Sequence, residues 1–478
     1  MPASPSTARA INDRLALRLL QQEGPLTAGQ LKQLTGLSRP TVADLVDRLT
    51  ASGLITVVGE SGARRRGPNA RLYGIVADRA HLAALDVRTQ GVLVLVSDLL
   101  GRVLAEASVP IGGDTGTGPA VEQAVAAVER ALKEAGTDRL HTVGIGAPGL
   151  IDPATGDLRD SAGLPAWHRS LAAALQDRLP GARVTVENET NLAALAEQRE
   201  GAARDRDTFV LLWLGHGVGA AVVLDGTLRR GASGGTGEIG FLPVPGTDAL
   251  PAATDCAGGF HSLTGAAAIA ILATRHDLPT PPSQDGPGAA EVVRAAVAEV
   301  TGALGTADPG DAARGAVGAP RSAGRPGSAR AGDQPGSVAQ GASAQPAGAA
   351  RAAVGAPGPV ALPAAARAAS GEPGAGTLSA DGPAARFLRA LADRVAVGVA
   401  SVVAVLDPGC VVLGGEVGQA GGAVLAGLVE ERLRRMSPLL TEVRASSLGG
   451  TAVLRGALLT ARERAQDELF GPPERMGG

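Results

Sequence analysis

The segment VENETNLAALAE, residues 186–197, decides how the larger part of this 478-residue chain folds. An apolar, strand-like stretch ends at the pair Asn188-Glu189, and a helical pattern begins there. Carboxylates at such a strand-to-helix junction often carry chemistry. Glu189 could therefore be a catalytic base, a group that binds a ligand, or a group that stabilises the N-terminus of the helix through its dipole.

Strand-like and helical segments alternate on both sides of this junction. They follow one another through residues 80–305, and a helical pattern at 383–406 leads into a strand-like run at 410–413. This alternation predicts an α/β fold. Glycine lets a backbone approach a ligand closely, so several glycine turns at strand ends favour a binding site. Such turns occur at residues 144–149, 215–219, 231–240 and 414–415.

Composition divides the chain into four parts. Residues 306–381 are mainly Ala, Gly, Pro, Ser and Arg. Such a segment cannot bury enough apolar surface to offset its ordering entropy, so we predict a disordered insertion. The helix and strand that follow need neighbours, and we therefore assign residues 79–305 and 382–470 to one interrupted domain. Residues 1–78 form a separate N-terminal module.

The N-terminal module has the pattern of a winged helix-turn-helix. A first helix spans about residues 11–22, Thr27 is placed to cap a short second helix, and Ser38 to cap a third, with Pro40 in its first turn. Two strand-like runs, residues 53–58 and 71–75, can pair beyond the third helix. The third helix has the size and position of a helix that reads the DNA major groove.

Charge supports a DNA contact by this module. Residues 1–75 hold ten Arg or Lys and five Asp or Glu, and therefore carry about +5. The alternative is a small three-helix interaction module whose arginines form a solvated face, because 42 of the 44 basic residues of the chain are arginine. We predict contacts to phosphates or base edges from the third helix and from an arginine-rich wing: Ser38, Arg39, Thr41, Arg48, Arg64, Arg65 and Arg66.

Several classes of protein are disfavoured by the whole chain. The two cysteines, Cys256 and Cys410, suggest no disulfide framework. The N-terminal pattern lacks the apolar core of a signal peptide, and the longest apolar run falls short of the ~20 residues that span a bilayer. We expect a cytoplasmic protein without a membrane partner.

The larger domain resembles the ROK family, which comprises repressors, uncharacterised reading frames and sugar kinases. The resemblance implies a two-lobed, actin-like (ribonuclease H-like) ATPase fold with a sugar cleft between the lobes, and sugar contacts from Asn188, Glu189 and Glu238. The N-terminal winged helix is what regulators of the family have and kinases lack. The matching segments are Gly144–Gly149, Asn188-Glu189 with Asn191 and Glu197, Gly217–Gly219, Gly237–Gly240 and Leu413–Gly415.

The chain departs from the family's kinases in its nucleotide loops. The kinases' first loop is Asp-x-Gly-Gly-Thr, whereas Asp86 is followed here by Val-Arg-Thr-Gln. The second loop loses its hydroxyl at His216, and Glu189 stands where the kinases have their catalytic Asp. We therefore predict no catalytic residue. The remnants of the nucleotide loops are Asp86, Gly215, Gly217, Gly414 and Gly415.

The family's zinc site is also altered. Its histidine is replaced by Phe241, and Cys256 is the only nearby cysteine of the expected cluster. Cys256 and His261 together fall short of the about four ligands that a tetrahedral zinc needs. We predict neither a metal nor another cofactor.

These features predict a regulator of carbohydrate genes, acting as a repressor. The winged helix would bind operator DNA, and the degenerate kinase domain would bind a sugar or sugar derivative and form a homodimer or higher homo-oligomer. The alternatives are a ROK sugar kinase with an appended DNA-binding module, and a binding protein without an effector that is regulated only by a partner.

Overall fold

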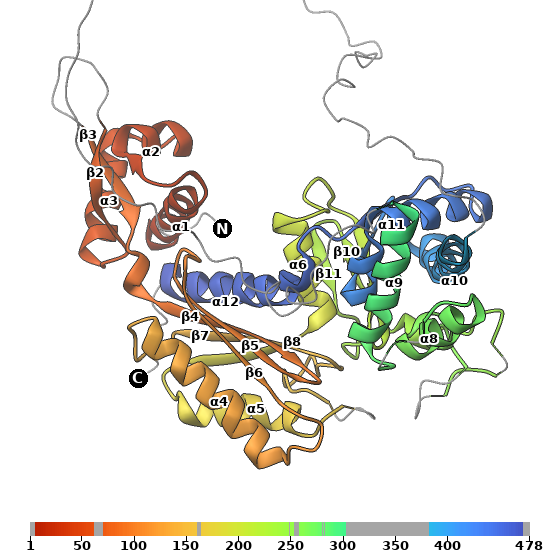
Figure 1. Cartoon of the computed structure of the whole chain (residues 1–478). Coiled ribbons are helices and arrows are strands. Elements are labelled where there is room, and N and C mark those ends of the chain that lie inside the picture. Colours follow the sequence, from red (N-terminus) through yellow and green to blue (C-terminus); the bar gives the residue numbers. More distant parts are fainter. Residues whose placement is uncertain are drawn as a thin grey trace, which may run out of the picture. The chain divides into compact units, whose positions relative to one another are not determined.

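Figure 1 shows the computed structural model, which describes residues 5–61, 70–159, 164–247, 249–252, 258–279, 281, 283–302 and 382–471. The predicted insertion at 306–381, the wing arginines Arg64, Arg65 and Arg66, and Cys256 lie outside these residues. Among the described helices, none combines the length and apolarity needed to cross a membrane.

The N-terminal module packs three helices against a small sheet. The helices are α1 (Pro5–Glu23), α2 (Ala28–Thr35) and α3 (Arg39–Ala51). The sheet has the strand order β1-β3-β2, with strands β1 (Leu26–Thr27), β2 (Ile55–Ser61) and β3 (Ala70–Ile75). A short 3-10 turn, η1 (Ala77–Arg79), leads out of the module.

Local hydrogen bonds explain where these helices begin and end. The Thr27 hydroxyl accepts from the Gln30 backbone N–H while Gln30 accepts from the Thr27 backbone, a reciprocal cap of α2. Gly36 ends α2 with φ 69°, a left-handed conformation that suits glycine. Ser38 accepts from the Thr41 backbone N–H and caps α3. The predicted winged helix-turn-helix is confirmed.

The first α/β lobe is built on a five-stranded sheet. Its strand order is β6-β5-β4-β7-β8, in which β4 runs antiparallel to β5 and parallel to β7. The strands are β4 (His81–Arg88), β5 (Gly91–Asp98), β6 (Val103–Pro110), β7 (Thr142–Ala147) and β8 (Arg183–Asn188). Because β4, β7 and β8 are parallel, their carboxyl ends meet at one edge of the sheet.

Helices cover both faces of this sheet (Figure 1). Helices α4 (Thr117–Glu134) and α5 (Trp167–Arg178) pack on one face. Helices α6 (Glu189–Glu200) and α12 (Ala452–Phe470) pack on the other. The approach of α12 is close: a Cβ on Gly144 of β7 would lie 2.5 Å from the carbonyl oxygen of Ala457.

The second lobe contains another five-stranded sheet, of order β11-β10-β9-β12-β13. Strand β12 follows residue 382, yet it pairs in parallel with β9, so segments on both sides of 303–381 share one sheet. The strands are β9 (Phe209–Leu214), β10 (Val218–Leu224), β11 (Thr227–Arg229), β12 (Cys410–Gly414) and β13 (Glu442–Ala445).

One hydrophobic core joins this second sheet to its helices. The helices are α7 (His261–Thr264), α8 (Ala266–Arg275), α9 (Gly286–Val300), α10 (Pro383–Leu406) and α11 (Gly415–Met436), with 3-10 turns η2 (Ile239–Phe241) and η3 (Gly449–Thr451). Helix α11 is kinked at Gly422, where φ is 52°. The predicted α/β fold with two lobes is confirmed.

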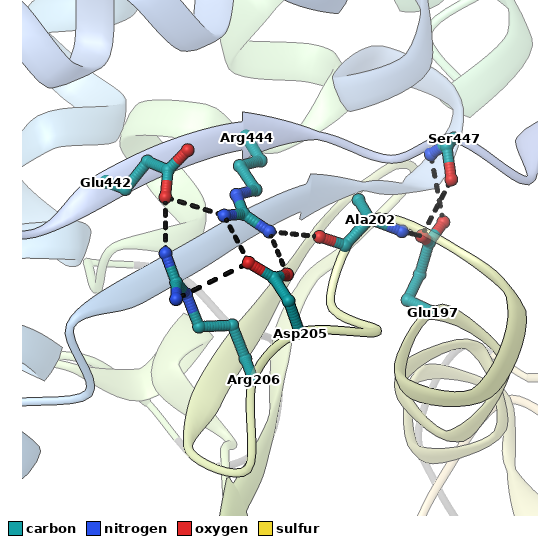
Figure 2. Close-up of polar contacts among 7 residues, drawn as sticks. All are labelled: Glu197, Ala202, Asp205, Arg206, Glu442, Arg444 and Ser447. Atoms are coloured by element: carbon teal, nitrogen blue, oxygen red, sulfur yellow. Dashed lines mark hydrogen bonds and ion pairs between the residues drawn. The ribbon is translucent and has the colours of Figure 1, made fainter. Parts of the chain in front are cut away.

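The chain passes between the two sheets at two crossings, residues 201–208 and 446–451, and the fully buried carboxylate of Glu197 holds them together (Figure 2). This carboxylate accepts hydrogen bonds from the Ala202 backbone N–H at 2.6 Å and from the Ser446 hydroxyl at 2.5 Å. The backbone N–H groups of Ser447 and Leu448 also donate to it, at 3.1 and 3.2 Å.

Arg444, on β13 just before the second crossing, holds the first crossing (Figure 2). Its guanidinium donates to the Ala202 carbonyl at 2.6 Å and to both carboxylate oxygens of Asp205, at 2.6 and 3.1 Å. It also contacts Glu442 at 2.7 Å, and Glu442 accepts from Arg206. The Arg444 guanidinium lowers the pKa of the Asp205 carboxyl to about 2. Both crossings are therefore fixed by charge-assisted hydrogen bonds.

Replacing Glu197 with Gln should lower the free energy of unfolding by about 2 kcal/mol, because the new amide nitrogen would face donors and leave buried N–H groups unpaired. The control is Glu200→Gln, at a surface carboxylate on the same helix that pairs with Arg455. Surface pairs contribute ~0–1 kcal/mol. Urea unfolding curves of both variants measure the difference, and equal midpoints would contradict the role of Glu197.

Candidate functional site

The exposed side of α3 is the candidate DNA interface. Val42, Leu45, Val46 and Leu49 are buried, which leaves Arg39 exposed and Thr41 half-buried at the start of the helix. The Ser38 and Thr41 hydroxyls lie 2.7 Å apart. A contact of these groups with DNA stays a prediction, as does the contact of the wing arginines.

Arg48 has partners within the N-terminal module. Its guanidinium donates to both carboxylate oxygens of Asp13 on α1, at 2.6 and 3.3 Å, and to Asp44 on α3. The Asp13 carboxylate raises the pKa of Arg48, as does Asp44. Arg48 therefore ties α1 to α3, and the DNA contact predicted for it requires that these pairs loosen.

Asn188 sits at the centre of the candidate sugar site. Its side-chain oxygen accepts from the backbone N–H groups of Thr190 and Asn191, at 2.9 and 3.2 Å, and thereby caps α6. Its amide nitrogen donates to the Gly149 carbonyl at 3.0 Å and to the Glu189 carboxylate at 3.1 Å. One side chain thus connects the glycine turn after β7, the carboxylate and the helix N-terminus.

Asn188, and not Glu189, supplies the capping hydrogen bonds of α6. Glu189 stands in the first turn, where the helix dipole favours a negative charge. Desolvation by burial outweighs this effect and raises the pKa of Glu189 to about 8. The neighbouring carboxylates of Asp86, Glu238 and Glu416 contribute to this rise. At neutral pH, Glu189 is thus mostly protonated and can both donate and accept a hydrogen bond.

Glu238 reaches the site through a glycine-dependent loop. Gly237 has φ 93°, and a Cβ there would lie 1.8 Å from the carbonyl oxygen of Ala220 on β10. Only glycine fits this approach, and it presents the adjacent Glu238 beside the other carboxylates. Glu238 remains exposed along part of its side chain, while desolvation of its carboxyl raises its pKa.

Glu187 is a site residue that our sequence analysis did not identify. One of its carboxylate oxygens accepts from the backbone N–H of Asn188 at 3.0 Å and from the Asn191 side chain at 2.9 Å. The other accepts from Arg230 at 2.7 Å. The sequence feature that could have identified Glu187 is its position directly before the Asn188-Glu189 pair. A cavity of about 190 Å³ borders this group and is lined by residues that include Asp152, Glu187 and Arg230.

The first remnant of the nucleotide loops is filled by side chains. Asp86 is buried and accepts from the Arg88 guanidinium at 2.6 and 2.8 Å, and Arg88 also donates to the Gly450 carbonyl at 2.9 Å. Gln90 donates to Asp285, the N-cap residue of α9, at 2.8 Å. The side chains that follow Asp86 therefore bond to protein groups where the family's kinases have glycines.

The second remnant is the turn Gly215-His216-Gly217 between β9 and β10. Its backbone closes through a hydrogen bond from the Gly215 N–H to the Gly217 carbonyl at 3.0 Å. His261 lies against this turn, because a Cβ on Gly217 would be 3.6 Å from its ring, and burial lowers the pKa of His261. The third remnant, Gly414-Gly415, starts α11.

No group of three or more His, Cys, Asp or Glu that could hold a metal occurs within the described parts of the chain. Cys256 lies outside them. The predicted lack of a metal therefore stays a prediction.

Comparison with known families decides the identity of the larger domain. Residues 83–272 and 377–464 match the ROK family. This chain belongs to the ROK family. Residues 11–66 of this ROK protein match the MarR family, whose match covers the winged helix-turn-helix.

Two relatives are regulators of transcription. The DNA-binding transcriptional dual regulator NagC of Escherichia coli (strain K12) is 27% identical over 277 residues, 56% of this chain and 64% of that protein. The xylose repressor of Caldicellulosiruptor bescii is 26% identical over 242 residues, 49% of this chain and 59% of that protein. The chain thus spans about three fifths of the length of these relatives.

Solved structures share the fold. A ROK family transcriptional regulator, a homologue of the E. coli MLC protein, matches 97% of this chain and 98% of its own with a TM-score of 0.64 at 19% identity. A ROK hexokinase from Thermus thermophilus matches 81% of this chain and 99% of its own with a TM-score of 0.52 at 25% identity. The fold is common to regulators and kinases, so the fold does not separate these functions.

The raised pKa of Glu189 predicts a pH-dependent stability. The ordinary value is 4.5 and the folded value about 8, so the folded state keeps a proton that the unfolded state releases. This contribution to stability is complete below pH 4.5 and is lost as the pH rises through 8. One pKa unit corresponds to about 1.4 kcal/mol, so a loss of about 2 kcal/mol or more is expected between pH 5 and pH 8.

Glu189→Gln keeps the side chain neutral and should remove this slope. Melting temperatures of the wild type and the variant from pH 5 to pH 8.5 measure it. The melting temperature of the wild type should fall relative to that of the variant as the pH rises. Parallel curves would contradict the raised pKa of Glu189.

Proposed function

We propose that this ROK protein is a sugar-responsive transcriptional regulator that represses carbohydrate genes. The observation that carries the proposal is the combination of a winged helix-turn-helix with a ROK domain whose first nucleotide loop is occupied by the Asp86–Arg88 pair and by Gln90. The winged helix binds operator DNA. The ROK domain binds a sugar at Asn188 and Glu189, and two-half-site operators call for a homodimer.

The carboxyl groups suit the recognition of hydroxyl groups. Glu189 is protonated at neutral pH and offers both a donor and an acceptor, and Glu238 stands beside it. As a general base, Glu189 would first have to lose its proton, and it carries one more methylene than the aspartate of the kinases. These two points favour binding over phosphoryl transfer. The named sugars of the relatives differ, and selection of bound genomic DNA with and without candidate sugars identifies operator and effector together.

The DNA part of the proposal is tested with the wing. Changing Arg64, Arg65 and Arg66 together to Ala should weaken binding to all duplex sequences, because fewer counterions are released. The slope of log K against log salt should become shallower by up to about 2.7. Arg39→Ala should also alter sequence preference. Fluorescence anisotropy with labelled DNA measures both.

The control is the double change of Arg434 and Arg435 to Ala, at exposed positions on α11 that pair with Glu430 and Glu431. This control should leave the slope unchanged. An unchanged slope in the triple variant would remove the wing from the interface.

The effector part is tested at the two carboxylates. Glu189→Ala and Glu238→Ala should abolish the response of operator binding to sugar while binding without sugar is kept, with Glu200→Ala as the control on the exposed face of α6. No ATP-dependent phosphorylation of any sugar is expected, since phosphoryl transfer depends on positioned charge around the phosphates. Phosphorylation that disappears in Glu189→Ala would favour the kinase alternative, and a normal response in both variants would refute the sugar site.

A further inference from the structure

Three backbone segments converge on the side chain of Glu416. They are the turn at Gly215, the first residue of α9, Gly286, and the start of α11. A Cβ on Gly215 would lie 2.4 Å from the Glu416 carboxylate, and one on Gly286 would lie 3.2 Å from it. The carboxylate therefore occupies the space that side chains at positions 215 and 286 would need.

The segments around Glu416 belong to the nucleotide half of the site. A Cβ on Gly286 would also lie 2.9 Å from the backbone nitrogen of His216, so this glycine packs directly on the second remnant loop. Gln90 of the first remnant loop reaches Asp285, the residue before Gly286, at 2.8 Å. Glu416 thus lies against the second remnant loop and the N-terminus of α9, and Gln90 of the first remnant loop reaches the residue next to that N-terminus.

One carboxylate oxygen of Glu416 is buried and has no hydrogen-bond partner among the described residues. A buried, unpaired charged oxygen is unfavourable, and such a group calls for an explanation. Glycine turns and the N-termini of helices offer a positive local field that favours an anion. The 15-residue helix α9 and the turn at Gly215 provide this field here. The carboxylate therefore lies where these backbone groups would favour an anion. Its buried oxygen, however, accepts no hydrogen bond from the described residues.

The surrounding charges offset part of the effect of burial on Glu416. Burial raises the pKa of Glu416, while its own backbone N–H and the guanidinium of Arg88 lower it, and His216 also favours the charged form. Asp86 opposes it. A polyphosphate bound at the Gly215 turn would therefore meet the carboxylate of Glu416.

We propose that the Glu416 carboxylate occupies the place of a nucleotide phosphate between the Gly215 turn and the start of α9. The nucleotide half of the site is then filled by the chain itself, and ATP and other polyphosphates are excluded by both space and charge. This inference rests on the proposed function, which divides the site of the ROK domain into a sugar half and a nucleotide half. It identifies Glu416 as the residue that excludes polyphosphates from the nucleotide half of the site.

The test uses the full chain and two variants of one residue. Glu416→Gly removes the carboxylate and its side chain, and Glu416→Gln removes only the charge. Glu431→Gly, at an exposed position farther along α11, is the matched control for placing a glycine in this helix. The probes are inorganic tripolyphosphate and ATP at low salt, with and without Mg²⁺, and the readouts are thermal shift and calorimetric titration.

Tripolyphosphate should raise the melting temperature of Glu416→Gly and of Glu416→Gln, and should bind them at least about tenfold more tightly than it binds the wild type, because a close like charge has been removed. Glu431→Gly should behave as the wild type. Circular dichroism at 222 nm checks that each variant is folded. The inference would be overturned if neither Glu416 variant bound tripolyphosphate more tightly than the wild type.

Failure of this inference and failure of the proposed function give different results. Operator binding and the sugar response are measured on the wild type and do not depend on the polyphosphate titration. A gain of polyphosphate binding in the Glu416 variants without any operator binding by the wild type would support the internal anion and refute the regulator.

Discussion

Helix α6 is buried along most of its length, so the polar groups of its first turn and the carboxylate of Glu197 must find hydrogen bonds inside the protein. Asn188 accepts from the backbone N–H groups of the first turn, and the Glu197 carboxylate near the last turn accepts five hydrogen bonds from the two crossings. The same two side chains fix other parts of the molecule. Asn188 holds the glycine turn after β7 through Gly149, and Glu197 fastens both crossings between the sheets. The site and the connection of the lobes thus depend on the two ends of one helix.

The chemistry of the site follows from removing carboxyl groups from water. Burial raises the pKa of Glu189 to about 8 and raises those of Asp86 and Glu416, although Arg88 opposes the shift of Asp86. Glu189, which is mostly protonated at neutral pH, can recognise hydroxyl groups as both a donor and an acceptor. The same carboxylates, where charged, disfavour the phosphates that a kinase must hold.

The remnant loops show how a common fold can serve another purpose. The turn at Gly215 and the start of α11 remain, while the side chains that follow Asp86 in the first loop bond to protein groups. Sheet topology is unaffected, because the strand order depends on backbone pairing and on the apolar cores of the two lobes. A few substitutions at strand ends can therefore change the ligand while the architecture persists.

The sequence by itself determined the α/β class, the winged helix-turn-helix and the caps at Thr27 and Ser38, because apolar periodicity and caps are local signals. It also placed the Asn-Glu pair at a strand end. Tertiary structure alone decided that Asn188 reaches the Gly149 carbonyl, that Arg48 pairs with Asp13, and that Glu187 pairs with Arg230. It also brought Glu416 against Gly215, some 200 residues earlier in the chain. Hydrogen-bond partners and desolvation depend on which segments pack together, and residues far apart in the chain carry no local pattern that reveals it.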